Sequence, residues 1–257
     1  MNLTSVQRVK DYLGLTASGS DAVIAQLIAR ASVQVQKWCT RSFERTTYAG
    51  AFVDGPGGKF MRLPDDPIIS LSSLTVANLL LSPSTDGIVA GYQYDDKYLY
   101  LFGGYTFPMG RRNVVVSYVA GYASSETDFI PAANGPYTIT PTTDGYASVD
   151  RGVANASTNV AYALVGSAPV AGQYSFASGT YTFNASDTGK SVVMSYDYSP
   201  GPVEQAVIEL VGGDLKQRDN LGIGSKTLRD ESITYTDKAM SASVLGLLAQ
   251  YRKNIPI

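Results

Sequence analysis

The chain of 257 residues contains no histidine. Histidine is the usual general base of Ser-His-Asp triads and Cys-His dyads, and it is a common zinc ligand. Its absence excludes most hydrolase mechanisms and every histidine-ligated zinc site. Cysteine is nearly absent too, because Cys39 is the only one. A single cysteine excludes an internal disulfide or a multi-cysteine metal site, and its place beside Trp38 predicts a small buried residue.

Charge and long apolar runs are also scarce. Charged residues make up 16% of the chain, against about 25% in typical soluble domains. The formal net charge of -2 disfavours tight nucleic-acid binding, which needs a broad basic field, but it leaves brief contact open. No apolar run reaches the roughly 18 residues of a membrane span, and the first residues predict an amphipathic helix and not a signal peptide. We therefore expect synthesis in the cytoplasm, no membrane contact and no cofactor.

Helical patterns occur at both ends of the chain. A first helix is predicted from Thr4 to Leu13, with Thr4 and Gln7 as a capping box and Gly14 as its stop. A long amphipathic helix is predicted from Asp21 to Thr40. Helical periodicity returns at Pro202, and a last helix carries the apolar residues Val244, Leu247, Leu248 and Tyr251.

Residues 43–122 show short strand-like runs separated by turn sequences. Ile68 to Val76 alternates, and Tyr92 to Leu101 reads as a hairpin that turns near Asp95 and Asp96. The glycine-rich segment 54–58 reads as a hairpin turn. These patterns predict a small antiparallel sheet.

Composition changes sharply in residues 123–200. This segment has Leu164 as its only leucine, is rich in tyrosine and threonine, and holds six acidic but two basic residues. Short runs of alternating residues between Gly, Pro, Asn and Asp predict a β-sandwich of immunoglobulin-like type. We therefore predict an α+β fold, in which a mainly helical body with a small antiparallel sheet, residues 1–122 and 201–257, is interrupted by an inserted all-β domain, residues 123–200.

Few residues suggest chemistry. The pairs Asp65-Asp66 and Asp95-Asp96 could bind a cation or act as acid and base, but Asp is also favoured in turns for its backbone hydrogen bonds. Residues 222–227 contain the glycines of a phosphate loop without its Gly-Lys-Ser/Thr order. Tyrosines beside Arg111 and Arg112 could form a binding surface for single strands or sugars, or simply cross-strand pairs; they are Tyr92, Tyr94, Tyr98, Tyr100 and Tyr105.

The order of these pieces resembles the head-tail connector (adaptor, head-completion) family of tailed bacteriophages. The resemblance extends over about 180 residues of the chain, and its matching segments are Leu3–Leu15, Leu27–Ser32, Trp38–Phe43, Leu63–Leu71, Val116–Tyr122, Ala206–Arg218, Leu221–Ser225, Glu231–Tyr235 and Leu248–Arg252. The departure from the family is the segment 123–200, which stands where the family passes directly from a strand to a helix.

The resemblance implies a structural virion protein and not an enzyme. Its copies would form a homo-oligomeric ring of twelve under the portal protein, at the neck between head and tail, and would offer a platform for a downstream neck or tail-completion protein. The segment 241–257 would dock on the portal, with Leu248, Tyr251, Arg252, Lys253, Ile255, Pro256 and Ile257. Double-stranded DNA would pass through the ring in transient, non-specific contact with Arg111, Arg112, Lys226 and Arg229.

Two alternatives stay open. In one, the β-rich segment is a binding module for a glycan or a capsid surface, and the helical body anchors it in the virion. In the other, Asp65, Asp66, Asp95 or Asp96 serves a metal-dependent hydrolase.

Overall fold

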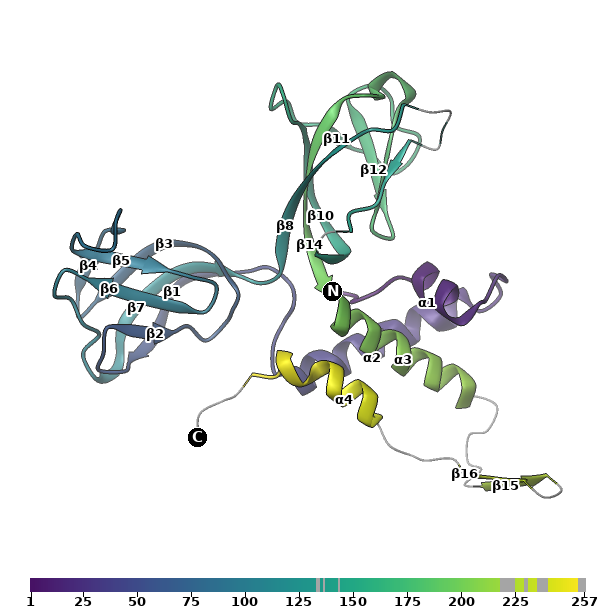
Figure 1. Ribbon diagram of the computed structural model, residues 1–257, viewed down its shortest axis with the longest axis horizontal. Helices are drawn as coiled ribbons and strands as arrows, with labels where there is room; N and C mark the ends of the chain where they lie inside the picture. The colour runs from purple at the N-terminus through teal and green to yellow at the C-terminus, as the bar shows by residue number, and fades with distance from the viewer. Residues whose placement is uncertain are drawn as a thin grey trace. The chain divides into compact units, whose positions relative to one another are not determined.

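The computed structural model describes residues 1–132, 135, 137–142, 144–217, 225–228, 231–234 and 240–253 (Figure 1). Contacts between residues divide the chain into two compact units. One unit is the continuous segment 42–123, and the other combines residues 1–41 with residues 124–257. The domain boundaries predicted near residues 122 and 200 stay a prediction.

The unit of residues 42–123 consists of two small antiparallel sheets. The first has the order β1-β7-β3-β4, with bounds Thr46–Gly55, Gly110–Ala120, Ile68–Val76 and Leu79–Leu81. The second has the order β2-β6-β5, with bounds Phe60–Arg62, Tyr98–Phe102 and Gly91–Tyr94. Alternate residues of both sheets face one core, which includes Met61, Leu63, Leu74, Leu99, Leu101, Phe107, Val114, Val116 and Tyr118.

Two turns of this unit were predicted with different success. The hairpin of β5 and β6 is confirmed, and Asp95 shapes its turn by accepting the backbone N–H groups of Lys97 and Tyr98 at 2.7 and 2.6 Å. The segment 54–58 is not the predicted hairpin turn, because β1 and β2 belong to different sheets. A Cβ atom on Gly55 would lie 2.1 Å from the carbonyl oxygen of Pro108, so the close approach of these two loops requires glycine.

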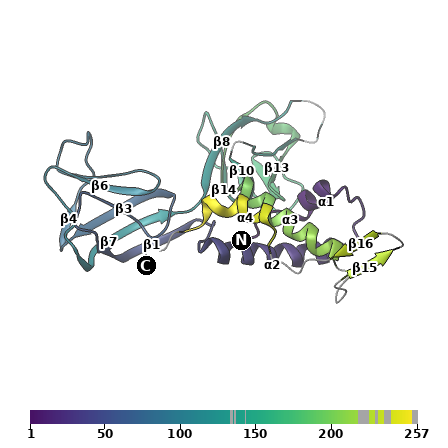
Figure 2. The same ribbon diagram turned by 60° about the horizontal axis from the view of Figure 1, so that its bottom comes forward.

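Four α-helices are described in the other unit, α1 (Val6–Leu13), α2 (Asp21–Cys39), α3 (Gly201–Gln217) and α4 (Ala242–Leu248), with a 3-10 turn η3 (Ala249–Tyr251) after α4. Helix α3 packs against the other three (Figures 1 and 2). Their apolar faces are buried, including Ile24, Ile28 and Val35 of α2 and Val203, Val207 and Val211 of α3. A Cβ on Gly212 would lie 3.2 Å from the Leu13 side chain, so glycine permits close packing of α1 on α3.

Helix α1 begins one residue later than the predicted capping box requires. Ser5 is the N-cap, and its Oγ accepts the backbone N–H of Arg8 at 3.3 Å. The Thr4 hydroxyl instead donates to a carboxylate oxygen of Glu204 at 3.0 Å. The predicted stop is confirmed, because Gly14 is the C-cap with a left-handed φ of 68°.

Residues 123–200 form two further sheets around one core. The first has the order β10-β14-β8 (Gly145–Asn155, Ser191–Pro200, Ala123–Phe129), and the second has the order β11-β12-β13-β9 (Ala163–Leu164, Gln173–Ala177, Thr180–Phe183, Thr138–Ile139). A 3-10 turn η1 (Ala185–Asp187) precedes β14. The shared core contains Tyr174, Tyr181, Phe183, Val192, Met194 and Tyr196. This order does not establish the predicted immunoglobulin-like topology.

Strands therefore dominate the described chain, and the prediction of a mainly helical body is wrong. Residues 42–123, predicted as a minor sheet, form two sheets with their own core. Short strands give only a weak alternating pattern in the sequence, whereas the long amphipathic helix α2 gives a strong pattern with a period of 3.6 residues. The helical share of the fold was therefore overestimated.

Strands β15 (Ser225–Leu228) and β16 (Glu231–Thr234) form a further antiparallel pair. In the described part of the chain no helix combines the length and apolarity of a membrane span.

The β-sandwich joins the helices in two ways. Strand β14 ends at Pro200 and α3 begins at Gly201, so no linker residue separates them. Glu204 of α3 is 4% exposed and accepts hydrogen bonds from Thr4 and from both the Nε and the Nη2 of Arg8. The Arg8 guanidinium also lies 5.5 Å from the ring centre of Tyr146, which belongs to β10. One ionic group thus connects α1, α3 and the sandwich.

We expect Glu204→Ala to lower the free energy of unfolding by about 2 kcal/mol, because it removes the charged acceptor of Thr4 and Arg8. Urea-induced unfolding followed by circular dichroism measures this change. Arg30→Ala is the matched control, since the pair of Arg30 with Asp214 is exposed and should contribute less than about 0.5 kcal/mol. Equal effects of the two substitutions would contradict the central role of Glu204.

Candidate functional site

The acidic pairs serve the fold. Asp66 is buried and accepts two hydrogen bonds from Arg62, at 3.1 and 2.5 Å, while Asp65 accepts the Tyr48 hydroxyl at 2.7 Å. The backbone N–H groups at the turn lower the pKa of Asp95, and Asp96 is exposed. Among the described residues, no group of three or more His, Cys, Asp and Glu is placed to hold a metal ion. These contacts support the interpretation of Asp95 as a turn residue. Asp65 and Asp66 instead bond to side chains of the fold, and none of the contacts supports a hydrolase.

Two other chemical motifs are also structural. Cys39 is buried as predicted, and burial raises the pKa of its thiol to about 11, so the thiol stays protonated at neutral pH. Residues 222–224 of the glycine-containing segment lie outside the described residues. The residues that follow, 225–228, form the strand β15, whereas a phosphate loop leads into a helix.

The channel candidates lie in both units. Arg111 and Arg112 are exposed at the start of β7. The Arg112 guanidinium lies 4.5 Å from the ring centre of Phe52, and its backbone N–H donates to Asp54 at 2.7 Å. Lys226 lies on β15 opposite Ile233, and Arg229 lies outside the described residues. Their role at DNA stays a prediction.

The predicted tyrosine surface is only partly assembled. Tyr92 is buried in the core and Tyr105 packs against it. Tyr94 and Tyr98 are exposed, and Tyr98 makes an edge contact with Phe60 at 6.1 Å between ring centres. The Tyr100 hydroxyl donates to Asp95 at 2.8 Å. Cross-strand packing therefore explains most of these tyrosines, as the alternative interpretation expected.

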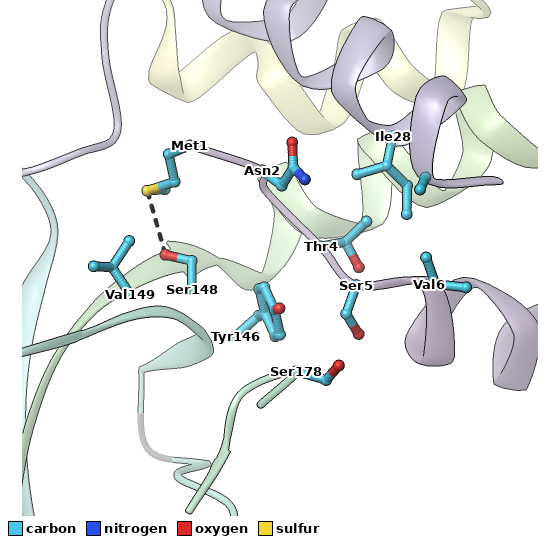
Figure 3. A pocket seen from close by; sticks show the side chains of 11 residues that line it. Met1, Asn2, Thr4, Ser5, Val6, Ile28, Tyr146, Ser148, Val149 and Ser178 are labelled. Atoms are coloured by element: carbon cyan, nitrogen blue, oxygen red, sulfur yellow. Dashed lines mark hydrogen bonds between the residues drawn. The ribbon is translucent and has the colours of Figure 1, made fainter. Parts of the chain in front are cut away.

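A cavity of about 390 Å³ lies between the N-terminal segment and the sandwich (Figure 3). Hydroxyl groups line it from both sides, including those of Thr4, Ser5, Tyr146, Ser148 and Ser178. The Ser148 hydroxyl donates to the Met1 sulfur at 3.3 Å. None of the lining side chains is ionised at neutral pH, so these side chains offer hydrogen bonds and no charge. Its residues come from distant parts of the sequence, which is why no local motif predicted it.

Comparison with known proteins gives the family. The family model described as head completion protein matches residues 2–134, about half of the chain. The chain belongs to the head completion protein family. The predicted resemblance is therefore confirmed, and with it the predicted location in the virion. The match includes α1, α2 and the whole unit of residues 42–123.

Two solved structures are similar to this head completion protein. One is a chain from the neck of an empty GTA particle computed with C6 symmetry, with 13% identity and a TM-score of 0.39. The other is a chain from the virion of a native gene transfer agent (GTA) particle, with 12% identity and a TM-score of 0.37. Each match covers 99% of this chain and 92% of the other. No curated protein matches.

The predicted docking element of this head completion protein begins in its helical bundle. Leu248 is fully buried, and Tyr251 is partly buried, which raises the pKa of its hydroxyl. The Arg252 guanidinium lies 5.3 Å from the ring centre of Trp38, and the backbone N–H of Lys253 donates to the Cys39 carbonyl at 2.9 Å. Ile255, Pro256 and Ile257 lie outside the described residues. The docking role itself stays a prediction.

A cluster that the sequence did not predict lies in the sandwich core. The hydroxyls of Tyr174 and Tyr181 donate to the two carboxylate oxygens of Asp150, at 2.6 and 3.1 Å. Burial, together with the Asp150 charge, raises the pKa of both tyrosines. Both hydroxyls act as donors to a carboxylate, so the cluster stabilises the fold while the tyrosines are protonated.

We expect the head completion protein to lose stability as the pH rises above about 10, the pKa of an unfolded tyrosine. The folded pKa values of Tyr174 and Tyr181 are raised, so their stabilisation is complete below that pH and is lost above it. Urea unfolding between pH 8 and 11.5, with tyrosinate absorbance, measures the effect. Tyr181→Phe should reduce the pH dependence, and Tyr12→Phe, at an exposed position, should not. Unchanged stability up to pH 11.5 would refute this expectation.

Proposed function

We propose that the protein is a non-enzymatic head-to-tail adaptor. Its copies form a ring of twelve under the portal, connect the capsid to the neck and tail, and let DNA pass. The family match over residues 2–134 carries this proposal. The absence of histidine and the structural engagement of Asp65, Asp66 and Asp95 support a role without catalysis.

A ring requires contacts that repeat from copy to copy and close after a whole number of steps. Surfaces with few charges and with exposed aromatic residues suit such contacts, and the chain offers Phe52, Phe60 and Phe129 as exposed aromatics. A formal charge of -2 suits a passage that DNA must leave again, because strong phosphate binding would hold it back. Arg111, Arg112, Lys226 and Arg229 then provide brief, sequence-independent contacts.

The C-terminal element is the proposed portal-docking surface. Buried Leu248 anchors it in the bundle, and Tyr251, Arg252 and Lys253 continue it along α2. The terminal residues Ile255, Pro256 and Ile257 supply apolar groups for a groove on the portal. The opposite end of the ring receives the downstream neck or tail-completion protein.

The second candidate function is a β-rich binding module for a glycan or a capsid surface. It is favoured by large exposed apolar residues on the segment 123–200, which are Phe129, Val160, Leu164 and Val170. In this case the helical body would anchor the sandwich in the virion, and the chain would not need to form a ring.

We expect native mass measurement and negative-stain imaging to show a ring when the chain is mixed with its cognate portal. The mass of the complex should exceed the mass of the portal alone by a whole multiple of 27.4 kDa, the mass of one chain. A chain that stays monomeric at all concentrations and ignores the portal would overturn the adaptor proposal. If that monomer binds capsid shells or glycans, the second candidate is favoured.

Truncation after Lys253 should abolish portal binding without changing the urea midpoint of unfolding. This truncation removes Asn254, Ile255, Pro256 and Ile257 but keeps the contacts of Arg252 with Trp38 and of Lys253 with Cys39. Binding is measured by co-sedimentation with the portal. Arg111→Ala, in the other unit, is the control that should still bind. Portal affinity equal to that of the full chain would refute the docking assignment.

A further inference from the structure

The sheet β1-β7-β3-β4 has two exposed edges of unusual character. Within the described residues, β1 pairs only with β7 and β4 pairs only with β3. Strand β1 contains no proline, and its one charged residue, Asp54, lies near its end. Phe52 of β1 is 56% exposed, and Leu79 and Leu80 of β4 are 51% and 69% exposed. Edge strands of this kind offer unpaired backbone groups to another strand.

Several other sheet edges carry protections that soluble proteins use against such pairing. The edge strand β2, for example, is three residues long and contains Arg62. Strand β8 contains Glu126 and Asp128, and β10 contains Asp150 and Arg151. At the edge strand β5, Tyr92 forms an isolated β-bridge with Pro83, so part of this edge is already covered. Strands β9 and β11 are two residues long each. Strand β4 is short too, with three residues, but two of them, Leu79 and Leu80, are exposed and apolar.

The register of the sheet shows that the two edges are complementary. Phe52 pairs with Val115, Val115 pairs with Thr75, and Thr75 pairs with Leu80. Directly paired residues lie on the same face of a sheet, so these four form one row across all four strands. Phe52 ends the row at one edge, and Leu80 ends it at the other. Neither residue carries a charge.

Strand direction permits the same sheet to continue into another molecule. Each of the three pairings is antiparallel, so β4 runs opposite to β1. A second copy placed beside the first in the same orientation would therefore bring its β1 antiparallel to β4, with the same face outward. The row would continue with Leu80 of one copy beside Phe52 of the next.

We infer that neighbouring copies are joined by pairing of strand β4 in one copy with strand β1 in the next, with Leu80 packed on Phe52. The inference rests on the proposed ring, because it names the surface that joins the copies of that ring. The contact is heterologous, since two different edges meet, and a repeated heterologous contact is what a cyclic assembly needs. A second copy is the occupant because both halves of the contact lie on one row of one sheet.

Disulfide cross-linking of the full chain tests this pairing. The variant Phe52→Cys with Leu80→Cys places two thiols at a cross-strand position, where Cβ atoms lie about 5 Å apart and a disulfide can form after a small adjustment. Copper phenanthroline with dissolved oxygen is the oxidant, which takes two electrons and two protons from each pair of thiols. The native Cys39 is buried and supplies no competing thiol. The oligomer, formed alone or on the cognate portal, should give a ladder of dimers, trimers and larger products on non-reducing gels.

Three control variants define the geometry. Phe52→Cys alone and Leu80→Cys alone should give no cross-link, because each thiol then faces an apolar side chain of its neighbour. A dimer from either single variant would show a symmetric edge contact and would overturn the inference. The third control is the double variant Phe52→Cys with Ile88→Cys. Ile88 is 79% exposed, so its thiol is at least as accessible as one at Leu80, but Ile88 lies outside the row. This variant should give no ladder.

The remaining outcomes separate this inference from the proposed function. An oligomer of unchanged mass that gives no ladder in the Phe52→Cys, Leu80→Cys variant would refute the strand pairing and leave the ring standing. A cross-link from this variant to the portal or to another virion protein, in place of itself, would also refute it. A chain that stays monomeric with and without the portal would refute the ring and the pairing together.

Discussion

The buried carboxylate of Glu204 is the constraint on which the larger unit depends. A carboxylate removed from water is tolerated only with compensating hydrogen bonds or an opposite charge. Thr4 and Arg8 supply both, so the N-terminal segment cannot move away from α3 without leaving that charge unsatisfied. Because the Arg8 guanidinium also faces the Tyr146 ring, the position of the sandwich strand β10 is linked to the same group. Because the Thr4 hydroxyl is bound to Glu204, Ser5 and not Thr4 caps α1, and the helix begins at Val6.

Local patterns in the sequence predicted the elements whose signals are local. Helix α2 and strand β3 lie where periodicity placed them, and Asp95 and Gly14 have the turn and cap roles expected of them. The proportion of strand to helix was not predictable in the same way, because a short strand is stabilised by partner strands from distant segments and has only a weak local signal. Strand β10 is 11 residues long but was not predicted, because two register shifts against β14 interrupt its alternation.

The site residues show the same limit. The turn role of Asp95 could be predicted from the sequence, because an Asp in a turn bonds to backbone groups a few residues away. The side-chain partners of Asp65 and Asp66 could not. The Asp150 cluster could not be predicted, since its tyrosines lie 24 and 31 residues further along the chain. What composition excluded, namely histidine chemistry and disulfides, agrees with a family whose name describes assembly. Most of the segment 123–200 lies beyond the matched residues.

The direct passage from Pro200 of β14 to Gly201 of α3 has a mechanical consequence. A flexible linker between a sheet and a helix absorbs rotation, whereas a strand that turns immediately into a helix passes torque from one to the other. Strand β14 is the central strand of its sheet, and α3 packs against the other three helices. A rotation of the sandwich would therefore turn α3 with it and disturb the packing of α3 against the other three helices.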